Sequence, residues 1–524
     1  MTPGGDGGVP AIGITDIAIA SAFGGDAQHT WEEVRRGNSA VHPSSRFGGV
    51  LMAEVDDGKM IDALLAGLDE RGVPPGTGIA LGTSVAPGQV PPGRSPYDLL
   101  PAAVEAFGLR GPRASFATGC VAGAHALCRA VDVIRSGRAP AMLVAGVEMP
   151  DRPTLEAFRG WRATDDAPMS PYSRSAGTNL GGGGAVLVLT ADPAAERVIA
   201  YVGGYGLASD AAHVTAPAAD GEGLARAMAA ALHDAGRSPA EVDYVNGHGT
   251  GTRANDQAEL NAMGGLFARP GPPLSSLKPQ IGHTLGASPV LEAALTAYAV
   301  RDQWLPPTIN VDPGGDPDWD IVPGVSRPAR LDVALTNSLA FGGMNCSIVL
   351  GRSPGAHPAS PARRVRFARV ARVPDQDAAR GLVPRRFAHR LDDLALRAVA
   401  AAVLARQAVE EPAGGVDPRR IGLVFATSTG PARSRAAFEA TLGEGRDDTF
   451  SPVATVNGAV SVVAGYISLS LRIQGPIAVI GASAADATVL EYASGFLRTG
   501  RADVVLVVHA DEGMPATGQA LFAL

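Results

Sequence analysis

The chain has 524 residues, of which 44 are Lys or Arg and 52 are Asp or Glu, so its formal net charge is −8 at pH 7. This acidic balance, without a long basic tract, excludes nucleic acid as the expected partner. No apolar run reaches the roughly 18 to 20 residues that a membrane-spanning helix needs, because charged residues, Pro and Gly interrupt each candidate.

The length predicts two to four domain-sized units. Short β-branched segments alternate with Ala-rich amphipathic segments along the first 350 residues. Buried strands are predicted at 12–20, 141–147, 183–189 and 346–350, and helices at 122–136, 223–235 and 290–301. This alternation is typical of an α/β fold with helices packed on mostly buried sheets. Residues 353–364 are rich in Pro, Ser and Ala and predict a linker.

After this linker the first part of the chain recurs. Residues 78–84 match residues 422–428, and residues 134–148 match residues 497–511 in the same order. Two ordered matches favour a duplication over two unrelated α/β segments. Counting back from the second match places Ser483 at the position of Cys120, or Ala484 if the one-residue gap lies downstream. Neither side chain forms a thiolate, so we expect the second copy to be catalytically silent.

The chain contains three cysteines, Cys120, Cys128 and Cys346, and no Cys-x-x-Cys pair, which argues against a disulfide framework or a cysteine zinc site and fits a reducing cytoplasm. Cys120 precedes the predicted helix at 122–136. A thiol at a helix N-terminus is a candidate nucleophile, because the exposed N–H groups stabilise a thiolate and can hold an oxyanion. The alternative is a buried structural cysteine, which is our interpretation of Cys128 and Cys346.

Two histidines follow in loops of small residues. His248 lies in Asn-Gly-His-Gly-Thr-Gly-Thr, where Thr250 and Thr252 add hydroxyl groups at alternate positions. His283 lies in Gly-His-Thr-Leu-Gly-Ala. Each histidine alone would be read as part of an ordinary solvated turn. Together with the thiol of Cys120 they suggest thioester chemistry.

Three further residues accompany these loops. Lys278 lies five residues before His283 and is either an exposed cation or, with Glu292 on the following helix, half of a buried ion pair. Phe341, in Ala-Phe-Gly-Gly-Met-Asn, is either a core residue or a mobile gate between small residues. The run Gly181 to Gly184 does not form a Gly-x-Gly-x-x-Gly motif between a strand and a helix, so no dinucleotide site is predicted.

The four motifs occur in the order found in the β-ketoacyl synthases, and the chain from about Ile12 to Leu350 resembles this family of condensing enzymes with the thiolase fold. The resemblance implies a five-layered α/β/α/β/α core for residues 1–352. It also implies roles for the residues above. The catalytic residues would be Cys120, His248 and His283, supported by Lys278 and Glu292; the oxyanion hole would use the backbone amides of Cys120 and Phe341, with Phe341 as the gate; and the phosphopantetheine contacts would be Thr250 and Thr252.

By this resemblance, the cysteine takes an acyl group from an acyl carrier protein. The histidines then hold a malonyl-type thioester while it loses CO2, and the resulting enolate attacks the acyl-enzyme. Neutral donors near a developing enolate oxygen suit this reaction, so no metal or redox cofactor is expected. The implied partners are an acyl carrier protein, which brings its own phosphopantetheine, and acyl and malonyl thioesters. The pathway would be fatty-acid-like, polyketide or polyene biosynthesis.

Residues 365–524 resemble a truncated chain-length-factor partner of these enzymes, and we expect a half-thiolase-fold α/β domain there. The first copy has only 27 residues from Ser84 to Gly111, against 47 from Ser428 to Gly475 in the second. Since family members pair through their N-terminal halves, the chain is expected to form an intramolecular pseudo-heterodimer or a homo-oligomer. The first copy also departs from the family at Gly119 and at Ser288-Pro289, where Ala and Ala-Gly are common.

Other functions stay open at this point. The chain could be an acyltransferase or malonyl decarboxylase that forms no carbon–carbon bond. It could also be a non-catalytic partner that only binds acyl carriers, although the intact Cys-His-His set argues against this for residues 1–351. A cysteine hydrolase fits two glycine-rich histidine loops less well.

Overall fold

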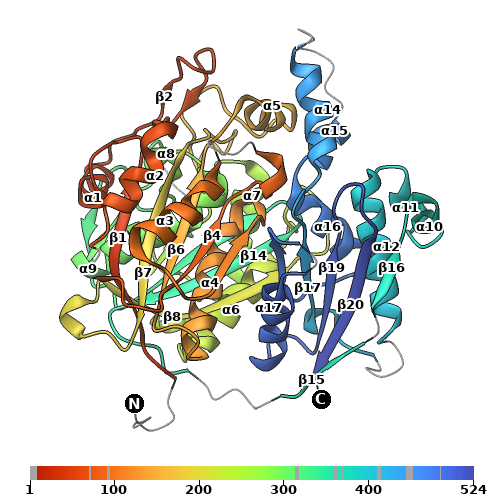
Figure 1. Cartoon of the computed structure of the whole chain (residues 1–524). Helices are drawn as coiled ribbons and strands as arrows, with labels where there is room; N and C mark the ends of the chain where they lie inside the picture. The colour runs from red at the N-terminus through yellow and green to blue at the C-terminus, as the bar shows by residue number, and fades with distance from the viewer. Residues whose placement is uncertain are drawn as a thin grey trace.

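The structure is a computed structural model that describes residues 9–69, 72–90, 95–312, 318–357, 363–368, 370–409, 415–443, 452–483 and 485–523. Within these residues a single mixed sheet of 16 strands runs through both copies of the repeat (Figure 1). The predicted linker is described only at 353–357 and 363–364, and its other residues lie outside the described ranges.

The first part of the sheet comes from the first 191 residues. Its strands, in spatial order, are β1 (Ile12–Ala20), β7 (Gly183–Ala191), β6 (Ala141–Glu148), β4 (Gly78–Gly82) and β5 (Arg113–Phe116). β4, β5 and β6 are parallel to one another, while β7 runs antiparallel to β1 and β6. All eight residues of β6 are buried, as expected for a strand covered on both faces.

The second part of the sheet carries the histidine motifs. Its strands are β8 (Ala200–Ser209), β14 (Met344–Gly351), β13 (Val333–Ala340), β9 (Tyr244–Asn246) and β10 (Leu274–Ser275). β8 joins β1 through two residue pairs only, so the strands on either side of this junction form two sheets that face each other. The structure therefore places the Cys120 motif and the histidine motifs on different sheets.

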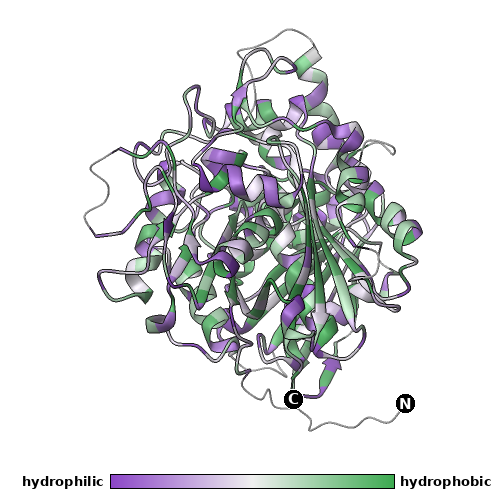
Figure 2. Cartoon of the chain, turned by 90° about the vertical axis from the view of Figure 1, so that its left-hand side faces the viewer, coloured by the Kyte–Doolittle hydropathy of each residue, from purple (hydrophilic) through white to green (hydrophobic). Residues whose placement is uncertain are grey.

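Helices complete the layers. α4 (Ala122–Arg135) and α9 (Ser288–Asp302) lie between the two sheets, α2 (Asp57–Ala66) and α3 (Leu99–Phe107) cover the first sheet, and α6 (Glu222–Asp234) and α7 (Arg253–Leu266) cover the second. Thirteen residues of α9 are buried, which is typical of a helix surrounded by protein on all sides. The expected five-layered α/β/α/β/α core is thus present. Hydrophobic residues gather in its strands and central helices (Figure 2).

The second copy repeats the order of the first sheet. Its strands, in spatial order, are β18 (Ile477–Ile480), β17 (Ile421–Ala426), β19 (Val504–His509), β20 (Ala516–Ala523) and β15 (Val365–Phe367), a sequence that mirrors β5, β4, β6, β7 and β1. α12 (Asp393–Gln407) and α17 (Ala487–Arg498) pack on this sheet from its two sides (Figure 1). The second copy therefore continues the sheet of the first.

The two copies meet where β5 and β18 pair antiparallel, with Phe116 opposite Ile480. The N–H of Ala117 donates to the carbonyl of Val479 at 3.0 Å, and the N–H of Gly481 donates to the carbonyl of Ser115 at 3.0 Å. These two bonds are equivalent by a local twofold axis that relates each residue to the one 364 positions later.

This register bears on which residue corresponds to the candidate nucleophile. The pairing relates residues 115–117 to 479–481 with an offset of 364, and if this offset continues to Cys120, its counterpart is Ala484, the alternative to Ser483. Ala484 lies outside the described residues.

Apolar and charged contacts also cross this junction. The ring of Phe116 meets that of Tyr492 edge-on at 5.2 Å, and the buried Arg129 pairs with Glu491 at 3.1 Å. One continuous hydrophobic cluster contains residues of both copies. In the part of the chain that the structure describes, no helix is both long enough and apolar enough to span a membrane.

Candidate active site

Cys120 lies in the short turn η4 (Gly119–Val121), between the end of β5 and the start of α4. Gly119 has φ +57, a conformation that glycine adopts readily. Burial raises the pKa of the Cys120 thiol to about 12, with the positive charge of Lys278 acting in the opposite direction. The stabilisation that we expected from the helix N-terminus is thus outweighed by desolvation, and the resting thiol is protonated at neutral pH.

The second copy holds the residues just before Cys120. The Thr118 hydroxyl oxygen accepts a hydrogen bond from the N–H of Val479 at 3.1 Å and lies 2.9 Å from Nδ1 of the buried His125. Sequence analysis missed both partners. The contact with Val479 depends on the pairing of β5 with β18, which no local pattern predicts.

The two histidines are buried and adjacent. The rings of His248 and His283 are 5.5 Å apart and nearly perpendicular. Burial and the charge of Lys278 lower the pKa of both imidazoles well below the usual range. Both rings are therefore neutral at neutral pH, and each has one nitrogen that donates and one that accepts.

Lys278 and Glu292 form the buried pair that was one of the two alternatives for Lys278. Nζ of Lys278 lies 2.5 Å from Oε1 of Glu292, and both side chains are fully buried. The same Nζ lies 3.3 Å from Nδ1 of His248. Since an ammonium group only donates, His248 accepts at Nδ1 and carries its proton on Nε2. Burial raises the pKa of Glu292 to about 7, against the effect of Lys278.

Glu259, on α7, fixes the backbone of the first histidine loop and was missed by sequence analysis. Its carboxylate accepts from the N–H of His248 at 2.8 Å and from the N–H of Gly249 at 2.9 Å. The hydroxyl of Tyr172 donates to it at 2.7 Å. A buried acidic residue on a helix that follows the motif by 11 positions is the only signal that the sequence offers.

Ser288 occupies one of the positions where the chain departs from the family pattern. Its hydroxyl lies 3.2 Å from Nδ1 of His283 and 3.0 Å from the hydroxyl of Thr284. When Ser288 donates to Nδ1, the proton of His283 is on Nε2, as in His248. The departure therefore adds a side-chain partner to the second histidine.

Two cavities meet at Cys120. The larger has a volume of about 620 Å³. Apart from Lys278 and Glu292, all the candidate site residues from the sequence line it, namely Cys120, His248, Thr250, Thr252, His283 and Phe341. The hydroxyls of Thr250 and Thr252 lie 2.9 Å apart. The structure thus brings together residues that are separated by more than 220 positions in the sequence.

The smaller cavity, of about 80 Å³, also borders Cys120. An aromatic cluster of Phe158, Trp161 and Phe341 lines both cavities. The ring of Phe341 lies 5.8 Å from that of Phe158 and 5.0 Å from that of Trp161. Phe158 belongs to α5 (Arg152–Gly160), and Trp161 is the residue at which this helix ends. Phe341 is accordingly a partly buried cavity-wall residue that also packs against the hydrophobic core.

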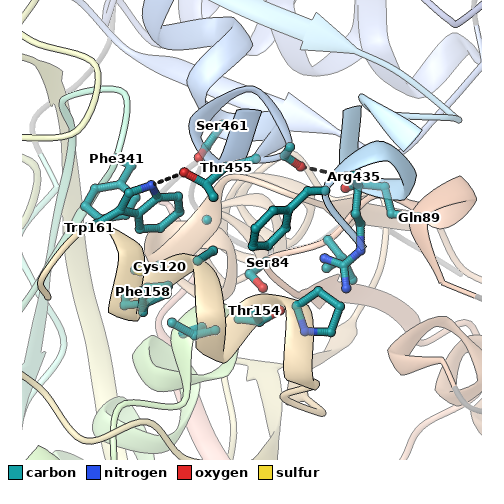
Figure 3. Close-up of a pocket in the computed structure, with 18 residues that line it drawn as sticks. Ser84, Gln89, Cys120, Thr154, Phe158, Trp161, Phe341, Arg435, Thr455 and Ser461 are labelled. Atoms are coloured by element: carbon teal, nitrogen blue, oxygen red, sulfur yellow. Dashed lines mark hydrogen bonds between the residues drawn. The ribbon is translucent and has the colours of Figure 1, made fainter. Parts of the chain in front are cut away.

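The second copy supplies much of the smaller cavity (Figure 3). Its lining from this copy includes Arg435 and Phe438 of α14 (Ala432–Gly443), Thr455 of α15 (Pro452–Asn457), and Ser461 of α16 (Val460–Leu471). The indole N–H of Trp161 donates to the hydroxyl of Thr455 at 2.8 Å, and the Gln89 amide donates to the carbonyl of Gly458 at 2.9 Å. The longer 428–475 segment therefore closes a cavity that the shortened first copy leaves open.

A five-layered α/β core that brings one cysteine and two neutral histidines to a single cavity defines a thiolase-fold acyltransferase site. Comparisons with known proteins agree. The family model described as Beta-ketoacyl synthase, N-terminal domain, matches residues 97–195 and 357–522, and the model of the C-terminal domain matches residues 199–312. The chain belongs to the β-ketoacyl synthase family of condensing acyltransferases.

Two relatives carry the name 3-oxoacyl-(acyl-carrier-protein) synthase 2. The protein of Rhizobium meliloti (strain 1021) is 41% identical over 263 residues, which cover 47% of this chain and 62% of that protein. The protein of Vibrio harveyi is 30% identical over 402 residues, which cover 64% of this chain and 97% of that protein.

Two solved structures resemble this chain in fold, one over about two thirds of its length and the other over nearly all of it. The ishigamide ketosynthase/chain length factor is 26% identical with a TM-score of 0.60, covering 65% of this chain and 99% of that chain. The PfaC Keto synthase-Chain length factor has a TM-score of 0.76 and covers 98% of this chain and 78% of that chain. At 14% identity this second likeness concerns the fold alone.

Proposed function

We propose that residues 1–352 act as a 3-oxoacyl-(acyl carrier protein) synthase that elongates a Cys120-bound acyl group with a malonyl-type unit. The observation that carries this proposal is the convergence of Cys120, His248 and His283 on one cavity. The substrates are acyl and malonyl thioesters of an acyl carrier protein, whose phosphopantetheine arm enters past Thr250 and Thr252. The chain needs no cofactor of its own in this proposal.

In the first step the sulfur of Cys120 attacks the thioester carbonyl of the acyl carrier. The backbone N–H groups of Cys120 and Phe341 hold the oxyanion, and the carrier thiol leaves as the acyl group moves to Sγ. Because the resting thiol is protonated, its proton must leave during the attack. The departing carrier thiolate takes up this proton, because the accepting Nδ1 atoms of His248 and His283 already face Lys278 and Ser288.

In the second step the malonyl carrier loses CO2. The Nε2–H groups of His248 and His283 donate to the thioester oxygen, where negative charge develops as the C–C bond breaks. The enolate carbon then attacks the acyl carbonyl on Cys120, the bond between the carbonyl carbon and Sγ breaks, and the 3-oxoacyl carrier leaves. The cysteine thiolate takes up a proton from solvent. Lys278, held by Glu292, fixes the His248 tautomer that this step requires.

Replacing either His248 or His283 with Ala should lower malonyl decarboxylation by roughly 10² or more, the scale of losing a positioned donor, while leaving measurable acyl loading of Cys120. Release of labelled CO2 from malonyl carrier, measured beside intact-protein mass, tests this. Equal losses of loading and decarboxylation would indicate collapse of the site and contradict the assignment.

Replacing Ser288 with Ala removes the side-chain hydrogen bond to Nδ1 of His283 and leaves the backbone of α9 intact. We expect decarboxylation to fall about 10-fold with little change in acyl loading, because the second histidine is then held less firmly in its donating tautomer. The matched control is Thr296→Ala, a buried hydroxyl on the same helix away from the histidines. A Ser288→Ala enzyme as active as the Thr296→Ala enzyme would refute this role.

The domain boundaries are part of the proposal: a ketosynthase unit at 1–352, a linker at 353–364 and a catalytically silent chain-length-factor-like unit at 365–524. We infer that the second unit acts as a built-in partner, giving an intramolecular pseudo-heterodimer whose smaller cavity accepts the acyl chain. The hydrogen bonds of Trp161 and Gln89 to the second unit support this inference.

The deciding experiment is intact-protein mass spectrometry after incubation with acyl carriers of several chain lengths, followed by malonyl carrier. An acyl adduct that disappears as an elongated 3-oxoacyl carrier forms supports condensation. An adduct that is transferred without elongation would favour the simple acyltransferase, and CO2 release without elongation would favour the decarboxylase. No adduct and no CO2 release would leave the non-catalytic carrier-binding partner.

A further inference from the structure

A buried carboxylate that no step above uses lies at the end of β6. Glu148 is 3% exposed and accepts three hydrogen bonds. Its Oε2 accepts from the N–H of Ser84 at 2.9 Å and from the N–H of Gly286 at 3.0 Å, and its Oε1 accepts from the hydroxyl of Ser84 at 2.9 Å. One side chain thus connects the turn after β4 to the turn that follows His283.

The second of these turns is η7 (Leu285–Ala287), and its backbone is constrained. Leu285 has φ +44, a left-handed conformation that side chains other than Gly, Asn and Asp seldom adopt. A Cβ atom at Gly286 would lie 2.4 Å from the nitrogen of Ser84, so the two turns are in direct backbone contact. The N–H group that donates to Glu148 belongs to Gly286, the residue directly after the strained Leu285.

Both turns border the active site. Ser84 and Leu285 line the smaller cavity beside Cys120, and Leu285 follows His283 by two residues. A shift of η7 therefore moves the second histidine and the wall of the acyl cavity together. Ordered neighbours of this kind determine how closely a donor approaches its acceptor.

The second copy contains a natural comparison. Asp511 occupies the matching position after β19 and accepts from the N–H of Ser428 at 2.7 Å and from its hydroxyl at 2.8 Å, as Glu148 does with Ser84. Its other donors are local, including the N–H of Thr429 at 3.0 Å. The described residues of the second copy include no counterpart of the His283 turn. Both copies thus have a carboxylate that accepts from a serine. The longer side chain, Glu148, occurs in the first copy, where it also reaches the turn after His283.

We propose that Glu148 is a positioning residue for decarboxylation, holding the His283–Leu285 turn against the Cys120 site through the Gly286 amide. This inference rests on the proposed function and assigns a role in it to a residue outside the Cys-His-His set. Burial raises the pKa of Glu148 to about 7, so its carboxyl group is partly protonated at neutral pH. The hydrogen bond from the Gly286 N–H depends on the length of the Glu148 side chain and on its acceptor oxygens, and it does not need a full negative charge.

The test compares two substitutions of Glu148. Glu148→Asp keeps the serine contact, as Asp511 does, but is one methylene too short to reach Gly286. We expect malonyl decarboxylation to fall about 10- to 100-fold with acyl loading within about 2-fold of wild type, the scale of a displacement near 1 Å. Glu148→Gln can accept both N–H groups at Oε1 while its amide donates to the Ser84 hydroxyl, so it should retain most of the decarboxylation rate.

Asp511→Asn is the matched control. It alters the equivalent contact with Ser428 in the second copy, whose described residues include no histidine turn, and it should leave the ratio of decarboxylation to loading unchanged. A parallel loss of both reactions in Glu148→Asp, or an equal loss in Glu148→Gln, would overturn the positioning role. If Glu148→Asp does not fold, Ser84→Ala replaces it, with a several-fold fall of the ratio expected and a wild-type ratio counting against the proposal.

Hydrogen exchange separates this inference from the proposed function. Amide exchange of a peptide spanning residues 284–290 should be faster in folded Glu148→Asp than in wild type, because the Gly286 N–H loses its acceptor. If the wild-type chain released no CO2 from malonyl carrier, the proposed function would fail while this measurement still tested the contact. Unchanged exchange would overturn the Gly286 contact whatever the activity.

Discussion

Replacing Cys120 with Ala is expected to abolish acyl loading, with a fall of at least about 10³-fold in condensation, the scale of removing a catalytic nucleophile. Of the three thiols, Cys120 alone borders the two cavities. The other two, Cys128 and Cys346, are fully buried, with their sulfur atoms 3.8 Å apart. Neither can replace the missing nucleophile.

The same variant should still release CO2 from malonyl carrier, because decarboxylation depends on His248 and His283 and needs no thiol. Intact-protein mass and CO2 release together give the result. Cys128→Ala is the control and should load normally. Iodoacetamide inactivation with the adduct on Cys128 or Cys346 would show that the nucleophile is assigned wrongly.

Removing residues 354–524 should cost both solubility and activity. The truncation exposes β5 as an edge strand, uncovers Phe116 and removes the Val479 backbone that holds Thr118 two residues before Cys120. It also removes Phe438, Thr455 and Ser461 from the smaller cavity. An unpaired strand beside an apolar surface favours aggregation.

The measurement is the soluble yield of residues 1–353, with its product profile, against the full chain. Mixing with separately produced residues 363–524 tests whether the missing surface can be restored in trans. Thr118→Val in the full chain is a milder companion: it breaks the side-chain contact with Val479 without exposing β5, and should slow acyl loading more than it lowers stability. A soluble 1–353 fragment with the full chain's activity and products would disprove the role of the second copy.

The sequence predicted the local elements well because their signals are local. The strand at 12–20 has the predicted bounds, and the helix at 290–301 begins two residues earlier, at Ser288. The motifs also selected the cysteine and both histidines that line one cavity, since binding and catalytic residues often lie on loops held by a rigid scaffold. The duplication was readable from the two ordered matches.

Several site features could not be read in this way. Lys278 had two interpretations until packing buried it against Glu292. Nothing in the sequence pointed to Glu148 or Ser288 as hydrogen-bond partners, and the only signal for Glu259 was its place 11 positions after His248. The sequence could not show that burial raises the pKa of Cys120, because the surroundings of the thiol come from distant segments. The choice between Ser483 and Ala484 as the counterpart of Cys120 stayed open for a similar reason, since a gap of one residue is fixed only by tertiary pairing.

The sequence by itself thus determined the family, the strand and helix order and the cysteine and histidines that converge on one cavity, because residue identity and periodicity act over short distances along the chain. Tertiary structure alone decided how the second copy joins the first. The β5–β18 pairing aligns two segments 364 residues apart, and only this pairing brings Thr455 and Ser461 to the cavity beside Cys120. Contacts of that range are set by how whole layers bury their apolar faces, which no short segment of sequence encodes.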